Sequence, residues 1–163
     1  MADIEIQGLD KVLKGFGNLS RGMQKTIEQA MGKSIQHLAG EAKKVWPVDM
    51  GQSRASLGAS APKGISDIKA LGGEIVGRMG SKLPQAPVIE FGRRAGARMP
   101  PPDLIEEWAH RHGMDGAGFV IARAIARRGL PAHHILEKTA RNGAPKVVEL
   151  FEKALDKVLE DNL

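Results

Sequence analysis

The chain contains no cysteine and no tyrosine, and its aromatic residues are four phenylalanines and two tryptophans. The absence of cysteine excludes disulfides and thiolate metal sites and permits a reducing compartment. No uncharged run approaches the roughly 18 residues of a membrane-spanning helix, and the acidic start of the chain lacks the regions of a secretory signal. We therefore expect a soluble cytoplasmic product whose stability comes from packing or assembly.

The 163 residues, 42% of them hydrophobic, are enough for the core of one ordinary domain but not of two. The 20 glycines and 9 prolines indicate extended loops and a light core that could depend on neighbouring subunits. The sequence predicts a single domain over residues 1–163.

The charge is unevenly distributed along this basic chain, which has a net charge of +5 and a pI of about 9.6. Basic residues outnumber acidic ones between Arg93 and Arg141, and the reverse holds from Lys146 to the C-terminus. This distribution favours charge-complementary contacts with a partner or with an identical subunit, and it also permits weak attraction to nucleic acid. Charge alone does not choose between them.

The N-terminal part predicts a strand and two helices. Ile4 and Ile6 alternate with polar residues, as in a short edge strand. Apolar residues at helical spacing predict a short helix at 9–16 and a long one over Arg21–Val45, of roughly 37 Å at 1.5 Å per residue. The apolar stripe of the long helix comprises Met23, Ile27, Ala30, Met31, Ile35, Leu38, Ala39 and Ala42. This stripe favours packing on a sheet of the same subunit, with self-pairing across Gly22, Gly32 and Gly40 as the alternative.

The segment 46–57 predicts a stiff joint after this helix. Pro47 ends the helix, Asp49 can cap its own turn, and Gly51 can adopt a positive φ. Beyond the joint we expect antiparallel strands at 54–61 and 73–80 joined by a loop at 62–72, and a further strand at 86–92.

The second half predicts a basic loop followed by helices. A mobile loop at about 92–102 ends in three prolines that make its exit rigid. Asp103 and Glu106 suggest a capping box for a helix at 104–111 that ends near Gly113 and turns Leu104, Ile105 and Trp108 inward.

Two further helical segments complete the chain. Residues 118–128 predict a basic amphipathic helix whose apolar side includes Val120. Residues 133–163 predict two helices or one kinked helix, since 142–145 interrupt the pattern. Their predicted apolar face comprises Val147, Val148, Phe151, Leu155, Val158 and Leu159.

No residue pattern indicates catalysis, a cofactor or a metal site. The histidines lack the i, i+4 or Cys/His spacing of zinc ligands. Glu90 is interpreted as an outer strand residue or a salt-bridge partner of Arg54 or Arg78. No Gly-x-Ser-x-Gly or phosphate-binding glycine loop occurs.

Three landmarks together resemble the head-tail joining and tail-completion proteins of tailed bacteriophages. Pro47, Val48, Asp49, Gly51 and Ser56 stand as in the family's "Pro-Val-Asp-Thr-Gly" turn, with Met50 in place of Thr. Residues 88–92 are similar to its "Val-Glu-Phe-Gly" segment, and 99–102 to its "Met-Pro-Pro" element. More weakly, 121–136 resemble its helical insertion. The residues and the resemblance together predict an α+β fold, with a small antiparallel sheet packed against the long N-terminal helix and the C-terminal helices.

The resemblance implies a structural, non-enzymatic virion-assembly protein of the neck or tail, made in the host cytoplasm. It implies self-association in a sixfold ring, with other neck or tail proteins as partners and non-specific contact with DNA in the channel. The expected subunit or partner interface comprises Arg93, Arg94, Arg98, Met99, Arg123, Arg127 and Arg128. We expect the loop at 93–98 to order against a neighbouring subunit. A basic nucleic-acid-binding protein is the alternative, and a hydrolase using Glu90 or a histidine is a distant third.

Overall fold

The computed structural model describes residues 2–6, 21–58, 63–71 and 74–160, which form two compact units. Unit 1 comprises Met1–Ala86 and His134–Leu163, and unit 2 comprises Pro87–His133. The chain passes into unit 2 within helix α4 (Gln85–Phe91) and returns just before helix α7 (Ile135–Glu160). Each unit has its own internal contacts. The single folding domain therefore stays a prediction.

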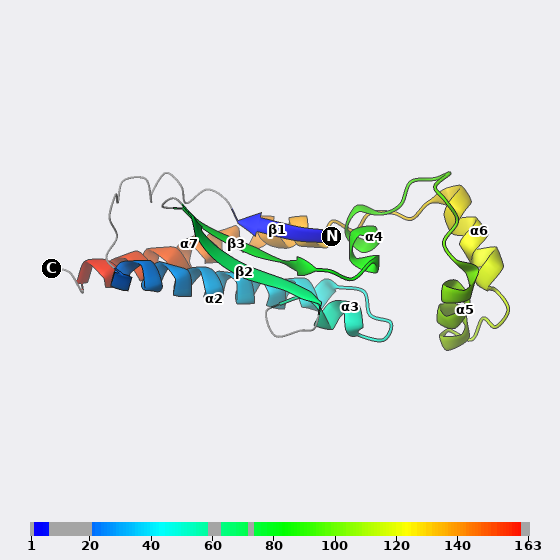
Figure 1. Cartoon of the computed structure of the whole chain (residues 1–163), viewed down its shortest axis with the longest axis horizontal. Helices are drawn as coiled ribbons and strands as arrows, with labels where there is room; N and C mark the ends of the chain where they lie inside the picture. Colours follow the sequence, from blue (N-terminus) through cyan, green and yellow to red (C-terminus); the bar gives the residue numbers. More distant parts are fainter. Residues whose placement is uncertain (1, 7–20, 59–62, 72–73, 161–163) are drawn as a thin grey trace. The chain divides into compact units, whose positions relative to one another are not determined.

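Unit 1 contains a three-stranded antiparallel sheet of strands β1 (Ala2–Ile6), β2 (Gly64–Leu71) and β3 (Glu74–Ser81). The strand order is β1-β3-β2, so that β1 lies at an edge as predicted. β3 is central: it pairs along its whole length with β2, and its residues Gly77–Ser81 pair with β1 (Figure 1). The predicted short helix at 9–16 falls outside the described residues.

Two long helices cover one face of this sheet. Helix α2 (Arg21–Val45) packs on β3 and β2 and lies beside α7, which contacts β1 (Figure 1). A side chain at Gly77 of β3 would meet Met31 Cγ at 2.8 Å and Ile35 Cδ1 at 3.0 Å, so this glycine lets α2 approach the strand closely. The predicted α2 stripe is buried apart from half-buried Met23. The α+β class and helix-on-sheet packing within one subunit are thus confirmed.

Helix α7 runs unbroken from Ile135 to Glu160 with Pro145 inside it. Its buried side chains include Val147, Phe151 and Val158. Val148 and Leu159, expected in the same face, are instead 54% and 53% exposed. Consecutive helical residues are turned by about 100°, so each of these two residues points away from the buried residue that precedes it.

The strand expected at 54–61 is wrong for its described part. Gln52–Ala55 form the short helix α3, and 56–58 continue as a turn. The expected loop at 62–72 instead contains β2, which pairs with β3 throughout. β2 was missed because polar Ser66, Asp67 and Lys69 give an edge strand the composition of a loop.

The strand expected at 86–92 is also wrong, because Gln85–Phe91 form helix α4. Val88 and Ile89 favour a strand by propensity, and a short apolar run does not distinguish the two structures. Pro87 favours the helix, because it lies in the first turn of α4, where the backbone N–H that proline lacks would have no partner within the helix. Glu90 is therefore a helical residue, and it is buried at 2% exposure.

Candidate interaction surface

The joint after α2 is held by buried and partly buried side-chain hydrogen bonds. Trp46, 3% exposed, donates from Nε1 to Ser53 Oγ over 3.0 Å. Ser56 Oγ lies 2.6 Å from the carbonyl oxygen of Ser53 and 2.7 Å from Ser81 Oγ, which also accepts from Leu83 N–H. These bonds tie the end of α2 to the end of β3. The segment 46–57 is therefore a structural joint within unit 1.

The local backbone explains the turn. α2 ends at Val45, before Pro47, as predicted. Gly51 has a φ of +76°, which confirms the predicted positive φ. Val48 and Met50, which lie between Pro47 and Gly51, are 53% and 60% exposed.

Unit 2 begins and ends as two segments bound to each other. Arg93 and Leu130 exchange backbone hydrogen bonds of 2.8 Å, and Gly96 N–H donates to Ala126 O over 2.7 Å. Gly129, at a φ of +74°, leaves room for this contact: a Cβ there would come within 2.8 Å of Ala95 N. The backbone at 93–96 is thereby fixed against the end of helix α6 (Gly118–Arg128).

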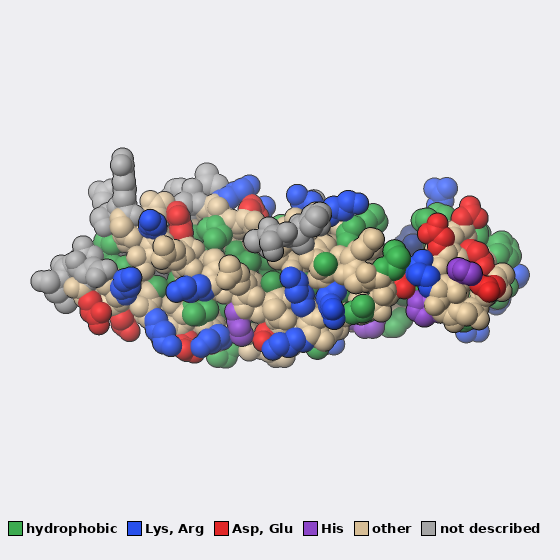
Figure 2. Space-filling view, turned by 90° about the horizontal axis from the view of Figure 1, so that it is seen from below, with side chains coloured by type: hydrophobic (Ala, Val, Ile, Leu, Met, Phe, Trp, Pro, Cys, Tyr) green, Lys and Arg blue, Asp and Glu red, His purple; other side chains and the backbone are tan. Residues whose placement is uncertain are grey.

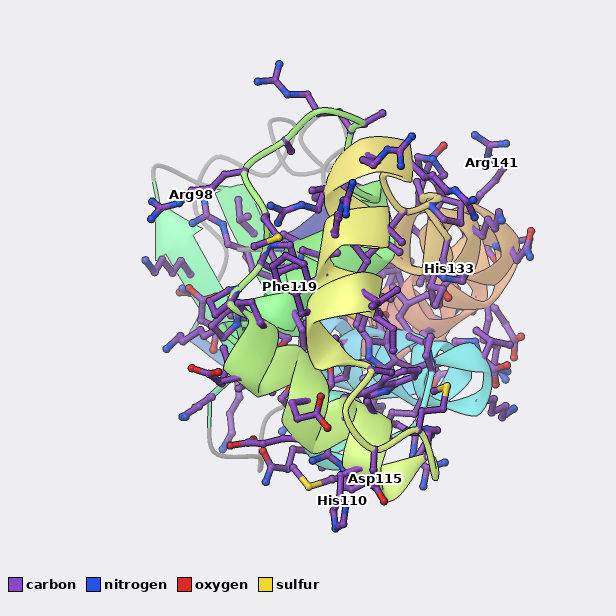
Figure 3. All side chains as sticks on the ribbon, turned by 90° about the vertical axis from the view of Figure 1, so that its right-hand side faces the viewer. Arg98, His110, Asp115, Phe119, His133 and Arg141 are labelled. Carbon is purple, nitrogen blue, oxygen red and sulfur yellow. The ribbon has the colours of Figure 1, made fainter. Side chains whose placement is uncertain are left out.

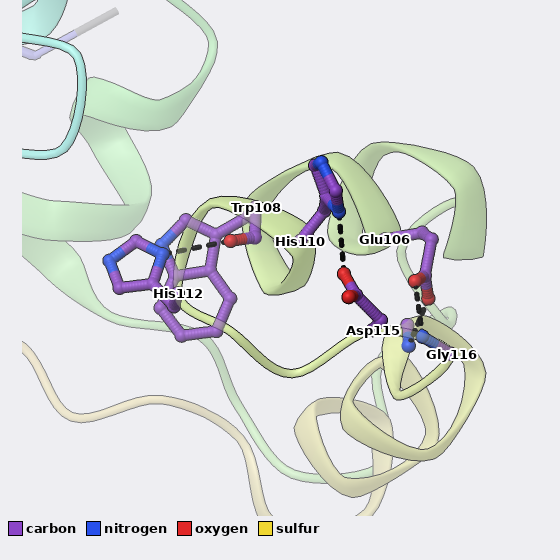
Figure 4. Close-up of polar contacts among 7 residues, drawn as sticks. Glu106, Trp108, His110, His112, Asp115 and Gly116 are labelled. Carbon is purple, nitrogen blue, oxygen red and sulfur yellow. Dashed lines mark hydrogen bonds and ion pairs between the residues drawn. The ribbon is translucent and has the colours of Figure 1, made fainter.

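Helix α5 (Pro102–Arg111) and α6 form a helical hairpin. Glu106 accepts hydrogen bonds from the backbone N–H groups of Gly116 and Gly118, each 2.6 Å long (Figure 4). The carboxylate thus satisfies N–H groups at the start of α6, where the helix dipole favours a negative charge. This corrects the predicted capping box. Proline lies in the first turn, Pro101 is the N-cap of α5, and no side chain caps it.

The turn between α5 and α6 involves both histidines of this region. His110 Nδ1 lies 2.5 Å from Asp115 Oδ1, and His112 Nδ1 lies 2.8 Å from Trp108 O (Figure 4). The rings of Trp108 and His112 stack with centroids 4.2 Å apart. Within residues 2–6, 21–58, 63–71 and 74–160, no group of three or more metal-ligating side chains could hold an ion.

The structure gathers most of the predicted interface arginines around the end of α6. Arg127 and Arg128 occupy its last turn, with Arg123 one turn earlier. Gly129 lies against the backbone of Arg93 and Arg94. All these side chains except half-buried Arg93 are exposed, and so are Arg98 and Met99 beyond the fixed segment (Figure 3).

The charges of these arginines are not neutralised within the part of the chain that is described. None of the six forms an ion pair with another described residue. Arg93 Nε is also buried without a hydrogen-bond partner among the described residues. A buried donor without an acceptor destabilises a fold.

Unit 2 also exposes large apolar side chains, of which the sequence interpretation includes only Met99 in the expected interface. Seven of the thirteen exposed large hydrophobic residues of the described chain belong to it. They are Phe91, Met99, Leu104, Met114, Phe119, Val120 and Leu130. Leu104, expected to face inward, is 61% exposed, and Val120, expected on the apolar side of its helix, is 67% exposed. At about 100° per residue, Phe119 and Val120 lie on the same side of α6 as Arg123 and Arg127. Because their hydrophobicity predicts burial, no signal in the sequence identifies them as exposed.

The described residues thus define an α+β protein whose helix-to-sheet joint is held by hydrogen bonds and whose second unit exposes apolar side chains together with arginines that lack ion-pair partners in the described chain. Residues 10–92 match the model of a family described as "Bacteriophage HK97-gp10, putative tail-component". The chain belongs to this family of bacteriophage tail components. No curated protein and no solved structure matches it.

The family match has a defined extent. It includes the joint, β2 and β3, and it ends at Gly92, so the arginines, the α5–α6 hairpin and α7 lie beyond it. The prediction of a phage structural protein is confirmed. Among the described helices, none combines the length and apolarity that crossing a bilayer requires.

Proposed function

We propose that this tail component is a head-tail joining or tail-completion protein, which acts by assembling with copies of itself in a ring at the neck or tail end of the virion. The observation that supports this proposal most directly is that unit 2 exposes large apolar side chains next to arginines without ion-pair partners in the described chain. Folded monomers rarely expose contiguous apolar patches without a binding role. Arginine and aromatic residues are also enriched in protein interfaces.

The interface in this proposal comprises Arg93, Arg94, Arg98, Met99, Arg123, Arg127 and Arg128, together with Phe119 and Val120. A sixfold ring is the form that the resemblance to the head-tail joining proteins favours. The assembled ring belongs to the virion, and assembly takes place in the host cytoplasm with other neck or tail proteins as partners.

Ordering of the basic loop on assembly is part of the proposal. The backbone of Arg93 and Gly96 is hydrogen-bonded within unit 2, whereas Ala97, Arg98 and Met99 form no hydrogen bond in the described chain. Segments with few hydrogen bonds open at low free-energy cost. We therefore expect fast amide exchange at 97–99 in the dilute monomer and slower exchange in the ring. Full protection of these amides in the monomer would contradict this.

The ring is tested on the full chain by sedimentation velocity and native mass spectrometry over a wide concentration range, with electron microscopy of the largest species. The expected result is a closed oligomer of one defined size. Replacing Phe119 and Val120 by Ser should shift the equilibrium toward monomer. The matched control replaces Val48 and Met50 of unit 1 by Ser, since these side chains are 53% and 60% exposed against 55% and 67% for Phe119 and Val120. A chain that stays monomeric at all concentrations would refute ring formation.

The alternative function, nucleic-acid binding, rests on the six predicted interface arginines, all of which belong to unit 2. On the face seen in Figure 2, Lys and Arg side chains are spread along unit 1 without gathering in one patch. A titration of duplex DNA against salt separates the two functions, because phosphate binding weakens steeply as salt rises. Non-specific contact in a DNA channel predicts weak binding at low salt that disappears at physiological salt. Tight binding at physiological salt would favour the alternative.

A further inference from the structure

The outer side of α6 combines apolar and basic side chains at regular spacing. Phe119, Arg123 and Arg127 follow one another at intervals of four residues, which places them about 6 Å apart along one side of the helix. All three are exposed, with Phe119 55% exposed. Figure 3 shows Phe119 on this helix. We call these three residues the α6 face.

The outer side of α7 carries the complementary pattern. Val148, Glu152 and Asp156 also follow at intervals of four residues and are all exposed, with Val148 54% exposed. Leu159, 53% exposed, lies one turn further along. Neither the Glu152 nor the Asp156 side chain forms an ion pair or hydrogen bond with another described residue. We call Val148, Glu152 and Asp156 the α7 face.

The two faces match residue by residue. Each consists of an apolar side chain followed by two charged ones, and the charges are basic on the α6 face and acidic on the α7 face. With equal spacing, Phe119 meets Val148, Arg123 meets Glu152, and Arg127 meets Asp156 when the helices run parallel. In an antiparallel arrangement, Arg123 meets Asp156 and Arg127 meets Glu152, and Val120 meets Leu159.

We infer that the α6 face of one copy of this chain docks on the α7 face of a second copy. This inference rests on the proposed self-association and names the surfaces that form it. The two faces differ, so the contact is heterologous: each copy offers both faces and can bind two neighbours. Heterologous contacts close into a ring when the rotation between copies permits. Apolar contact beside paired charges supplies both affinity and register.

Charge reversal tests the pairing on the full chain. Variant A carries Arg123→Glu and Arg127→Glu, and variant B carries Glu152→Arg and Asp156→Arg. Each variant alone should self-associate at least about tenfold more weakly, since like charges then face each other. An equimolar mixture of A and B, and a chain carrying all four substitutions, should both recover association. The control carries Lys25→Glu and Lys33→Glu at exposed positions of α2, and its self-association should equal that of the wild type.

Cysteine cross-linking supplies an independent readout, because the chain has no cysteine of its own. An Arg123→Cys chain mixed with a Glu152→Cys or Asp156→Cys chain should give a disulfide-linked heterodimer on mild oxidation. Either chain alone should not. A chain with one cysteine can form a disulfide only with another chain, so the product reports contact between copies.

The outcomes separate this inference from the ring itself. If the wild-type chain forms rings but variants A and B associate normally, the docking of α6 on α7 is wrong and the ring stands. Loss of association in A without recovery in the A and B mixture also overturns the docking, as do disulfide dimers of Arg123→Cys alone. A wild-type chain that never associates refutes both proposals.

Discussion

Ser56 Oγ lies 2.7 Å from Ser81 Oγ, and the two side chains are 1% and 0% exposed. This bond joins the segment 46–57 to the end of the central strand β3, across 25 positions of the chain. Replacing either serine by alanine leaves the other hydroxyl without this partner, and such a change costs about 1–3 kcal/mol in a buried site. The joint is therefore expected to contribute measurably to folding.

The prediction for the joint is a lower free energy of unfolding in Ser56→Ala and in Ser81→Ala, measured by urea denaturation. The double variant should lose less than the sum of the two single losses, because both remove the same bond. Ser66→Ala, at a half-buried strand position with no side-chain hydrogen bond in the described chain, is the control. Strictly additive losses would show that the two hydroxyls do not interact.

A second prediction concerns Glu106, whose carboxylate accepts the N–H groups of Gly116 and Gly118. Glu106→Ala should speed amide exchange of these two glycines by on the order of tenfold, equivalent to 1.4 kcal/mol of lost protection. Amide exchange resolved by residue checks this. Glu107→Ala is the matched control, because Glu107 is exposed and has no partner in the described chain. Equal exchange in the two variants would remove the capping role of Glu106.

The sequence predicted correctly those helices in which one apolar repeat runs over many residues. The bounds of α2 and α6 agree with the predicted ones because each stripe repeats for three turns or more. The predictions failed at 54–58, 64–71 and 86–91, where segments are short. There, partners distant in sequence decide the structure: β2 exists because it pairs with β3, and a short apolar run such as 86–91 fits helix and strand equally.

The candidate surface was predictable in its charges but not in its apolar part. The arginines of unit 2 stand out by residue type, and the exposure of their side chains follows from that type. The exposure of Val120, Val148 and Leu159 does not, since hydrophobicity predicts burial. Which apolar residue of a helix stays uncovered depends on which side the neighbouring elements occupy. Tertiary packing determines that, and a single sequence does not report it.

A third prediction compares two glycines of unit 2 that both have a positive φ. Gly129 and Gly96 have φ values of +74° and +76°, so an alanine is strained at either position. A Cβ at Gly129 would also meet the backbone of Arg93–Ala95, whereas at Gly96 nothing lies within 4 Å. Gly96→Ala should cost about 1 kcal/mol, and Gly129→Ala clearly more. Urea denaturation and exchange of the Arg93 and Leu130 amides provide the measurement. Equal losses of unfolding free energy in the two variants would mean that backbone strain destabilises both and that the close contact at Gly129 adds nothing.

The last prediction concerns pH and the outer side of α7. Hydrogen bonds from Lys146 and then Lys153 lower the pKa of Glu149 from 4.5 to about 2. A carboxyl group whose pKa is lower in the folded state stabilises the fold above its unfolded pKa, and this stabilisation is lost as the pH falls through the folded pKa. Glu149→Gln should therefore be less stable than wild type at pH 7, and the difference should shrink between about pH 5 and pH 2.

The size of this effect is limited by solvent, because the Glu149 side chain is 41% exposed and salt screens exposed pairs. The loss in Glu149→Gln should consequently be smaller at high salt, which urea denaturation at two ionic strengths can measure. Glu107→Gln removes an exposed carboxylate without an ion pair and serves as the control for the change in net charge. If Glu149→Gln followed the control at every pH, the pairs with Lys146 and Lys153 would contribute nothing to the stability of α7.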